Sequence, residues 1–510
     1  MNSHTPMRSI FAFTLLVWTV IILNSCNSSN PTGITTEQEL ATFPIVATIL
    51  NDKESIYYIN ADSYPDDDPG LPIGVFDSGT GGLTVLEAIL ALDAFRNSDK
   101  KQGADSVADF AGEDFIYLAD QANMPYGIYA SEGKSDLLVE HIIKDAWFLL
   151  ADKYYTDEKS VSHVTGKRPV KAIVIACNTA TAYGGEYLTE FMEVAGINIK
   201  VLGVIDAGVR GALACFEKDE DGTIGIMATI GTVASDGYEN TVIRLKEEMG
   251  FTGDLRVYSR GGHGIAEAVD GEADFIDRSL SSPRAGYRGP SLTDSLYRID
   301  RTLLDVYNFD FSSNKILCDS DDPNSCNVMQ INDAENYIRY HLVSLLETMR
   351  VSPGSQPMKA LILGCTHYPY LTAEIERVLD ELYDYKIDGN YVYRHLLAPE
   401  VTLIDPSVNV AIELYEFLRD VSLLREKAVK NHGHEFYISI PNVRNQNVKL
   451  DSNKRFTYEY KYGRKAGEIQ EYVRVVPFAA GNIPVETLER LEKGTPLSFK
   501  AITEFSSSGR

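Results

Sequence analysis

The chain has 510 residues, a length that predicts about two to four domains rather than one compact unit. Its composition, 44% hydrophobic and 24% charged, is typical of a globular protein and excludes a disordered or collagen-like chain. The net charge of -26 repels phosphate backbones, which argues against nucleic acid as a general partner. Six cysteines are too few for a disulfide scaffold, and no pair has the C-x-x-C spacing of a zinc site.

The N-terminal segment, residues 1–26, has the pattern of an export signal. Arg8 precedes an apolar run over residues 10–23, which has the length of a signal-peptide core and is shorter than the ~20 residues of a spanning helix. The run ends in LNSC, which resembles the lipobox of bacterial lipoproteins and implies lipidation of Cys26. A membrane anchor and a non-lipidated signal are the alternatives. We therefore expect a lipid-anchored protein of the bacterial cell envelope, on the periplasmic side or the cell surface.

The body of the protein is predicted to begin after a tether. Residues 27–70 are rich in Ser, Asn, Thr and Pro near their start and end in the acidic sequence YPDDDPG, so they are predicted to form a tether or N-terminal extension. From residue 71, short continuous apolar runs alternate with amphipathic stretches, which is typical of strands buried on both faces of a parallel α/β sheet. The expected strands are 73–76, 115–119, 172–176, 201–205, 223–228, 360–364 and 401–405.

Two regions interrupt this alternation. The polar segment of about 278–333 is predicted to be an insertion, and its Cys318 and Cys326 are the expected disulfide of an exported protein. Beyond residue 426, alternating segments such as FYISI and FTYEYKYG predict a β-rich C-terminal extension over 426–510. The sequence does not indicate what this extension does.

A glycine-rich turn follows the first expected strand. In IGVFDSGTGGLT, residues 73–84, Asp77 and Ser78 end the strand and three glycines precede a helix. Glycines let the backbone approach a ligand, and a helix N-terminus favours an anion. The spacing matches neither G-x-G-x-x-G nor a P-loop, so a nucleotide is disfavoured. A small carboxylate ligand and a tight turn without any ligand both fit.

Two cysteines occupy matching positions along the chain. Cys177 directly follows the strand 172–176 and Cys365 directly follows 360–364, where open α/β sheets bind ligands. A following helix start can stabilise a thiolate, although a single such cysteine is usually a small buried hydrophobic residue. Two cysteines in equivalent settings favour inversion of a carbon stereocentre, with one base on each face. A cysteine protease needs a dedicated histidine base, and a thioredoxin-like site places its cysteines close together in sequence.

The ordered set of motifs resembles the glutamate racemases, a family of cofactor-independent amino-acid racemases. The motifs lie at residues 73–86, 125–127, 177–179, 203–205, 231–235 and 363–371. The resemblance covers about residues 71–406 outside the insertions. It implies two similar α/β lobes with parallel sheets and the active site between them. The first lobe would be 71–203, with 372–425 returning to it, and the second 204–371.

The resemblance also implies roles for individual residues. Cys177 and Cys365 would be the two bases and should stay reduced, while Asp77 and His367 would assist the thiols. The residues expected to hold the substrate are Asp77, Ser78, Pro125, Tyr126, Gly127, Asn178, Thr179, Thr232, Thr366 and His367. Glutamate is the first choice of substrate, and aspartate or another amino acid is the next. No cofactor or metal is expected. A homodimer is a possible assembly that the sequence does not decide.

Other functional classes remain as alternatives at this point. A non-catalytic racemase-fold protein could bind amino acids or peptidoglycan fragments, and a thiol hydrolase or redox protein would also use cysteines. Asp206-Ala207 stands where the family has Glu-Pro, and residues 259–264 replace an apolar segment. Arg260 and His263 in that segment either reach the substrate or belong to a solvated loop, which we favour. Export is a further departure, because the family normally supplies D-glutamate to cell-wall synthesis in the cytoplasm.

Overall fold

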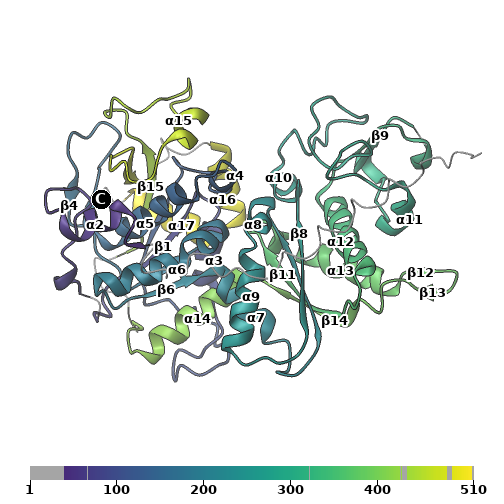
Figure 1. Ribbon diagram of the computed structural model, residues 1–510, viewed down its shortest axis with the longest axis horizontal. Coiled ribbons are helices and arrows are strands. Elements are labelled where there is room, and N and C mark those ends of the chain that lie inside the picture. The colour runs from purple at the N-terminus through teal and green to yellow at the C-terminus, as the bar shows by residue number, and fades with distance from the viewer. Residues whose placement is uncertain are drawn as a thin grey trace, which may run out of the picture.

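The computed structural model describes residues 40–65, 67–320, 322–425, 427, 433–478 and 485–507. The predicted signal peptide and Cys26 lie outside these residues. Figure 1 shows two α/β lobes side by side, the second of them in teal and green. Within the described part of the chain, no helix is long and apolar enough to cross a membrane.

The first lobe is built on a six-stranded sheet in the order β16-β15-β2-β1-β5-β6. Its strands are β1 (Ile73–Asp77), β2 (Phe115–Ala119), β5 (Ala172–Ile175), β6 (Lys200–Gly203), β15 (Glu435–Pro441) and β16 (Val473–Pro477). All neighbours pair in parallel except β15 and β16. Every residue of β1, β2 and β5 is buried, which explains their continuous apolar sequences.

Helices of the first lobe pack in two groups. In one group α5 contacts α6, and in the other α3 contacts both α14 and α17. The helices are α2 (Pro44–Asn51), α3 (Leu83–Ala91), α4 (Gly127–Ser131), α5 (Ser135–Leu150), α6 (Asn178–Ala195), α14 (Pro406–Asp420) and α17 (Pro496–Ser507). Shorter elements are η1 (Ala61–Ser63), β3 (Lys153–Tyr154) and β4 (Val164–Thr165).

The second lobe is built on a four-stranded sheet in the order β14-β11-β7-β8, with all strands parallel. Its strands are β7 (Gly222–Ala228), β8 (Leu255–Gly261), β11 (Met358–Gly364) and β14 (Leu397–Ile404). Its helices are α7 (Val204–Leu213), α8 (Ile230–Ala234), α9 (Gly237–Glu248), α10 (Ile265–Asp270), α12 (Ala334–Val351), η5 (Tyr368–Leu371) and α13 (Thr372–Asp384). A small hairpin, β12 (Lys386–Ile387) with β13 (Asn390–Tyr391), follows. Two parallel-sheet lobes confirm the predicted fold class.

The chain returns to the first lobe later than predicted. All seven expected strands form, although the strand predicted for 201–205 ends at Gly203 because Val204 begins α7. Residues 372–404 stay with the second lobe, since α13 packs on α12 and β14 pairs with β11. The return therefore takes place at α14, whose contacts with α3 and β6 attach it to the first lobe.

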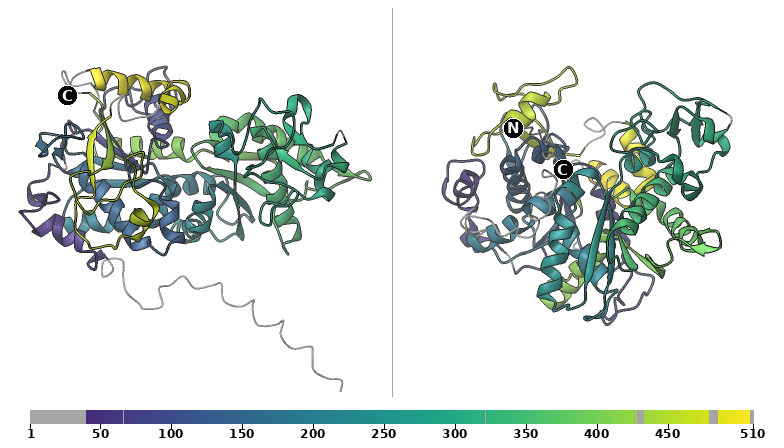
Figure 2. Two further views of the ribbon diagram at one scale, coloured as in Figure 1. Left: turned by 90° about the horizontal axis from the view of Figure 1, so that it is seen from above. Right: turned by 45° about the vertical axis from the view of Figure 1, so that its right-hand side comes forward.

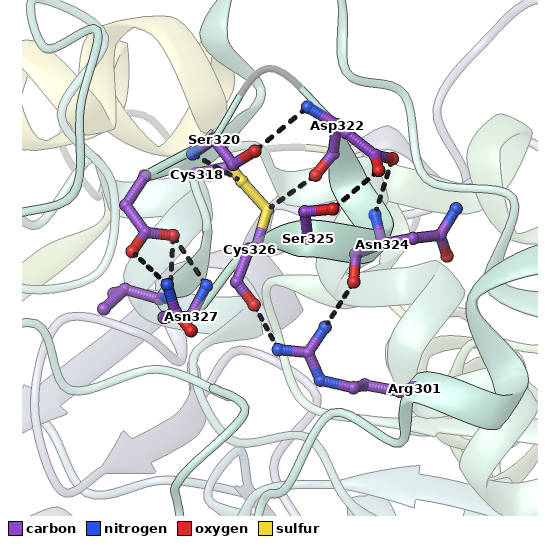
Figure 3. The surroundings of a disulfide bond; sticks show 10 residues. Arg301, Cys318, Ser320, Asp322, Asn324, Ser325, Cys326 and Asn327 are labelled. Atoms are coloured by element: carbon purple, nitrogen blue, oxygen red, sulfur yellow. Dashed lines mark hydrogen bonds between the residues drawn. A yellow bond between two sulfur atoms is a disulfide. The ribbon is translucent and has the colours of Figure 1, made fainter.

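The predicted insertion packs against α12 of the second lobe. It contains η2 (Arg301–Leu303), α11 (Leu304–Tyr307), η3 (Ser312–Asn314), η4 (Pro323–Ser325) and the antiparallel strands β9 (Ile316–Cys318) and β10 (Met329–Ile331). A disulfide joins Cys318 to Cys326, with 5.7 Å between their Cα atoms, which confirms the predicted pair. Arg301 donates hydrogen bonds to the main-chain oxygens of Asn324 and Cys326, as Figure 3 shows.

Both terminal extensions belong to the first lobe, as the purple and yellow segments of Figure 2 show. Part of the predicted tether is folded, because Ile45, Val46 and Ile49 of α2 are buried on the side of α5. The C-terminal extension supplies β15 and β16 together with α15 (Tyr458–Gly463), α16 (Val485–Gly494) and α17.

One segment of the C-terminal extension differs from its prediction. FTYEYKYG was expected in a β-rich region, but Tyr458–Gly463 forms the helix α15. Thr457 caps this helix by accepting a hydrogen bond from the Tyr460 N–H. The alternating tyrosines are also compatible with a helix, because Tyr458 and Tyr462 lie four residues apart and their rings meet at 4.7 Å.

Candidate active site

The predicted catalytic residues stand at the carboxyl ends of strands. Asp77 ends β1, and Cys177 follows β5, the strand that pairs with β1. Cys365 follows β11, an inner strand of the other sheet. Strand ends of this kind are where open α/β sheets bind ligands.

The carboxylate of Asp77 organises the glycine-rich turn. It accepts hydrogen bonds from the backbone N–H groups of Gly79 at 3.1 Å and Gly82 at 2.8 Å. A Cβ atom at Gly82 would lie 2.5 Å from the Cβ of Asp77 and 2.9 Å from that of Ala176, so only glycine fits there. Burial raises the pKa of Asp77, while the two N–H groups act in the opposite direction.

Cys177 is the N-cap of α6 and is 7% exposed. Its Sγ accepts a hydrogen bond from the Ala180 N–H at 3.4 Å, and its thiol donates to Ser78 Oγ at 3.7 Å. Burial raises the pKa of Cys177 to about 12, and the nearby Asp77 carboxylate acts in the same direction. Burial raises this pKa more than the N–H groups at the helix N-terminus lower it, so the thiol carries its proton at neutral pH.

Cys365 lies beside His367 in the second lobe. The Sγ atom of Cys365 is 3.7 Å from Nδ1 of His367, which is also 3.5 Å from Thr366 Oγ1. Cys365 is 5% exposed, and neither it nor Cys177 is in a disulfide. The structure therefore places a histidine next to one thiol and an aspartate next to the other.

Residues from both lobes share a small cavity. Asn178, the residue after Cys177, lines it together with Cys365 and Thr366. The remaining lining residues are Val85, Ala176, Val204, Leu363, Pro406 and Ser407. A hydrogen bond of 2.9 Å from Tyr238 Oη to Asn178 Oδ1 joins the lobes beside this cavity.

A second contact between the lobes joins two of the predicted substrate segments. A Cβ atom built on Gly231 of α8 would lie 3.4 Å from the Cα of Gly127, so the start of α4, just after Pro125, touches α8. The next residue, Thr232, is 2% exposed and its Oγ1 accepts a hydrogen bond from Thr229. Thr179 is buried in the first turn of α6.

The side chain of Tyr126 is buried and belongs to a hydrogen-bonded network. Its hydroxyl lies 2.6 Å from a carboxylate oxygen of Asp120 and 2.6 Å from one of Asp145. Because the hydroxyl has one hydrogen, one of the two carboxyl groups must be protonated, and burial raises the pKa of Asp145 well above its usual range. Any substrate contact of Tyr126 would therefore come from its main chain.

Comparison with known sequences indicates a relationship, although no protein-family model matches the chain. It is 30% identical over 199 residues to a glutamate racemase from Herpetosiphon aurantiacus, covering 39% of this chain and 58% of the relative. It is 37% identical over 169 residues to the glutamate racemase of Aquifex pyrophilus, and this match covers 33% of this chain and 49% of that relative. These matches span about half the length of the two relatives. A third match, 24% identical to the glutamate racemase of Limosilactobacillus fermentum, covers 72% of this chain and 85% of that relative. The chain is therefore similar to glutamate racemases over part of its length.

Solved structures of glutamate racemases also resemble this structure. The enzyme from Bacillus anthracis matches with a TM-score of 0.40 and 23% identity over 72% of this chain and 86% of that one. The enzyme from Francisella tularensis, solved in complex with D-glutamate, matches with a TM-score of 0.38 and 21% identity. This match covers 78% of this chain and 95% of that one.

Two residues that adjoin the site were not expected from sequence. Tyr238 is one, and nothing in the residues around it indicated that it would meet Asn178, 60 positions away. Asp405 is the other: it directly follows β14, much as Asp77 ends β1, and it caps α14 by accepting from the Ser407 N–H at 2.8 Å. The signal for Asp405 was present, since the expected strand 401–405 ends in this acidic residue and a proline follows.

The residues that depart from the family pattern are held by contacts within the second lobe. The preference for a solvated loop at residues 259–264 was wrong for Arg260, which belongs to β8 and donates to His341 Nδ1 at 3.2 Å, whereas His263 lies in the turn before α10. His263 stacks on Tyr297 of the insertion with 4.3 Å between ring centroids. Asp206 on α7 forms an ion pair with Arg244 on α9. Both Arg260 and His263 therefore contact the second lobe's own elements.

Proposed function

We propose that the chain is a cofactor-independent racemase that interconverts L- and D-glutamate by a two-base mechanism. The observation that carries the proposal is the placement of Cys177 and Cys365 at strand ends of opposite lobes, beside one shared cavity. Similarity to several glutamate racemases supports glutamate as the substrate. Aspartate or another amino acid is the next candidate.

The two thiols have complementary starting states in this mechanism. For L-glutamate, the Cys365 thiolate removes the α-proton, and the protonated Cys177 delivers its proton to the opposite face. The product is D-glutamate, with Cys365 now a thiol and Cys177 a thiolate, so the enzyme is ready for the reverse direction. The raised pKa of Cys177 supports its role as the acid in the first direction.

Neighbouring groups would assist each proton transfer. His367 Nδ1 is within reach of the Cys365 sulfur, and Asp77 lies beside Cys177. Donors at helix starts suit the substrate carboxylate, because backbone N–H groups and the helix dipole favour an anion. Asn178 and Thr179 at the start of α6 and Thr232 in α8 are the residues we assign to substrate binding.

We also propose that the protein is an exported lipoprotein of the cell envelope, attached through Cys26. The proposal rests on the apolar run 10–23 followed by LNSC. A racemase in that place acts on amino acids outside the cytoplasm, so supply of D-glutamate to cytoplasmic cell-wall precursors would not be its role.

The decisive test is racemisation in deuterated water. The protein is incubated with pure L- or D-glutamate, and chiral chromatography with mass spectrometry scores inversion and α-deuteration. Cys177→Ser and Cys365→Ser should each reduce racemisation by at least ~10²–10⁴-fold, because inversion needs both groups. Cys215→Ser changes the third free cysteine of the described residues, which is half-buried after α7, and should leave the rate unchanged.

Two results would overturn the proposal. Full racemisation by both cysteine variants would make these thiols structural. Binding of glutamate without exchange of its α-proton would show a non-catalytic amino-acid-binding protein. A parallel assay with aspartate decides the substrate, because inversion of aspartate with greater kcat/KM than glutamate would replace glutamate as the assignment.

A further inference from the structure

A second cavity lies within the first lobe and is lined by none of the residues assigned to the cysteine site. Three parts of the chain enclose it: Tyr57 after α2, His141 and Trp147 of α5, and Arg464 and Tyr472 of the C-terminal extension. About 50 Å³ of it is open to the centres of water molecules. That is room for about three waters or one small organic molecule.

Three buried nitrogen atoms of its wall have no hydrogen-bond partner among the described residues. They are Nε2 of His141, Nε1 of Trp147 and Nη1 of Arg464. The three side chains are 3%, 6% and 5% exposed, so bulk water does not serve them. An unsatisfied buried donor is unfavourable, and the tryptophan and arginine nitrogens can only donate. The wall therefore favours an occupant with acceptor oxygens.

The position of the arginine is held by other contacts. Nη2 of Arg464 donates to Asn123 Oδ1 at 2.8 Å, and Nε donates to the Lys461 main-chain oxygen at 3.2 Å. Its guanidinium also lies over the ring of Tyr472, 4.7 Å from the centroid. With these groups engaged, Nη1 remains for a ligand, and its charge favours an anion.

The acidic groups of the wall already have donors. Asp120 accepts from Asn123 and Ser439, and Asp120 and Asp145 share the Tyr126 hydroxyl, which lies 2.6 Å from each. Glu471 accepts from Tyr155 at 2.6 Å.

The lysines of the wall are engaged as well. Lys144 is paired with Glu140 at 2.6 Å, and Lys153 donates to two main-chain oxygens. Both ammonium groups have at least one hydrogen-bond partner, whereas Nη1 of Arg464 is a buried cationic nitrogen of this wall with none among the described residues.

The rest of the wall is mostly aromatic. Tyr57 and Trp147 meet edge to face at 4.9 Å, and both line the cavity with Tyr472. The other aromatic residues of the wall are Phe148, Tyr154 and Tyr155. Rings of this kind bury an apolar body, while the three free nitrogens bind a polar end.

We propose that this cavity is a binding site for a small carboxylate with an apolar body. The carboxylate accepts hydrogen bonds from Trp147, His141 and Arg464, and the body packs against the aromatic rings. The site is independent of the proposed racemase activity, since it uses neither cysteine. Asp120 and Asp145 of its wall hold the Tyr126 hydroxyl, so an occupant lies next to the groups that anchor the loop before Gly127.

Tryptophan fluorescence of the full chain reports on the site directly. The sequence has two tryptophans, Trp18 and Trp147, so Trp18→Phe leaves the cavity residue as the single emitter. Isovalerate and benzoate are the probes, and at least one should change the emission saturably. The uncharged isoamyl and benzyl alcohols should bind at least ~10-fold more weakly, because they lack the charged acceptor.

Matched variants decide whether the named residues form the site. In the Trp18→Phe background, Arg464→Gln and His141→Phe should each weaken binding of the probe by at least ~10-fold. His395→Phe, at an exposed residue of the second lobe, should not change it. His141→Phe retains a ring that can pack edge-on against Tyr129, so this variant should fold even if Arg464→Gln does not.

The proposal fails on either of two results. One is the absence of a saturable response to both carboxylates in a Trp18→Phe protein that unfolds cooperatively. The other is unchanged affinity in a folded His141→Phe protein, which would place the probe elsewhere.

Discussion

The Tyr238 hydroxyl donates a hydrogen bond of 2.9 Å to Oδ1 of Asn178, which joins the second lobe to the start of α6. Asn178 directly follows Cys177, so this bond acts close to one of the two thiols. Gly364 makes room for it, because a Cβ atom there would lie 2.8 Å from the ring of Tyr238. Burial raises the pKa of Tyr238, so the hydroxyl remains a donor across the neutral range.

Removing this hydroxyl should weaken the contact between the lobes. Tyr238→Phe is expected to lower the free energy of unfolding by about 1 kcal/mol and kcat/KM for glutamate severalfold, because Asn178 loses its partner. Denaturant unfolding and racemisation rates measure the two effects. Tyr391→Phe, an exposed tyrosine of the same lobe, is the control and should change neither. Wild-type values of both quantities in Tyr238→Phe would contradict this account.

The groups beside the thiols should affect the two directions differently. Asp77→Asn and His367→Asn should slow racemisation less than loss of a cysteine does, because the bases themselves remain. We expect kcat to fall unequally for L- and D-glutamate, in opposite senses in the two variants. The ratio of the two kcat/KM values must stay at unity, since the enantiomers have equal energy. Initial rates from each enantiomer test this, and equal falls in kcat in both variants would refute it.

The raised pKa of Cys177 predicts an alkaline loss of stability. The thiol titrates near ~8.5 in the unfolded chain but at about 12 when folded. Above pH ~8.5 the unfolded state therefore binds fewer protons than the folded state. The protein's free energy of unfolding then falls by up to about 1.4 kcal/mol per pH unit. Cys177→Ser should remove this part of the slope. Urea unfolding from about pH 8 to pH 11 would show identical slopes if the prediction is wrong.

The disulfide of the insertion should stabilise the fold without affecting catalysis. Replacing both Cys318 and Cys326 by serine should lower the free energy of unfolding by about 2–3 kcal/mol, the loop-entropy value for a separation of 8 residues. Racemisation should be unchanged, because neither cysteine lines the inter-lobe cavity. Non-reducing peptide mapping supplies the direct check. Free thiols at these two positions, or a bond between Cys177 and Cys365, would contradict the assignment.

The proposed lipid anchor predicts membrane attachment through a single residue. The wild-type protein should partition into detergent, and Cys26→Ala should release it into the aqueous phase because acylation is lost. Racemisation by the released protein should match the wild type. Equal membrane retention of the variant would refute the lipoprotein proposal and leave the enzyme proposal intact.

Local sequence patterns determined the elements and the positions of the thiols. Continuous apolar runs such as AIVI at Ala172–Ile175 predict a strand covered on both faces, because each residue must lose its contact with water. A cysteine directly after such a run then stands at a strand end whatever the neighbouring strand is. Cys318 and Cys326 are close enough in sequence for their pairing to be predicted as well.

Only the tertiary structure decided which elements are neighbours. An apolar run specifies burial but not its partner, so sequence did not show that β14 pairs with β11 or that β15, from Glu435, pairs with β2. The same holds for α15, where the tyrosine pattern suits a strand face and a helix face alike. The bond between Tyr238 and Asn178 also depends on how the two lobes dock, because hydrogen bonding between distant residues leaves no local pattern.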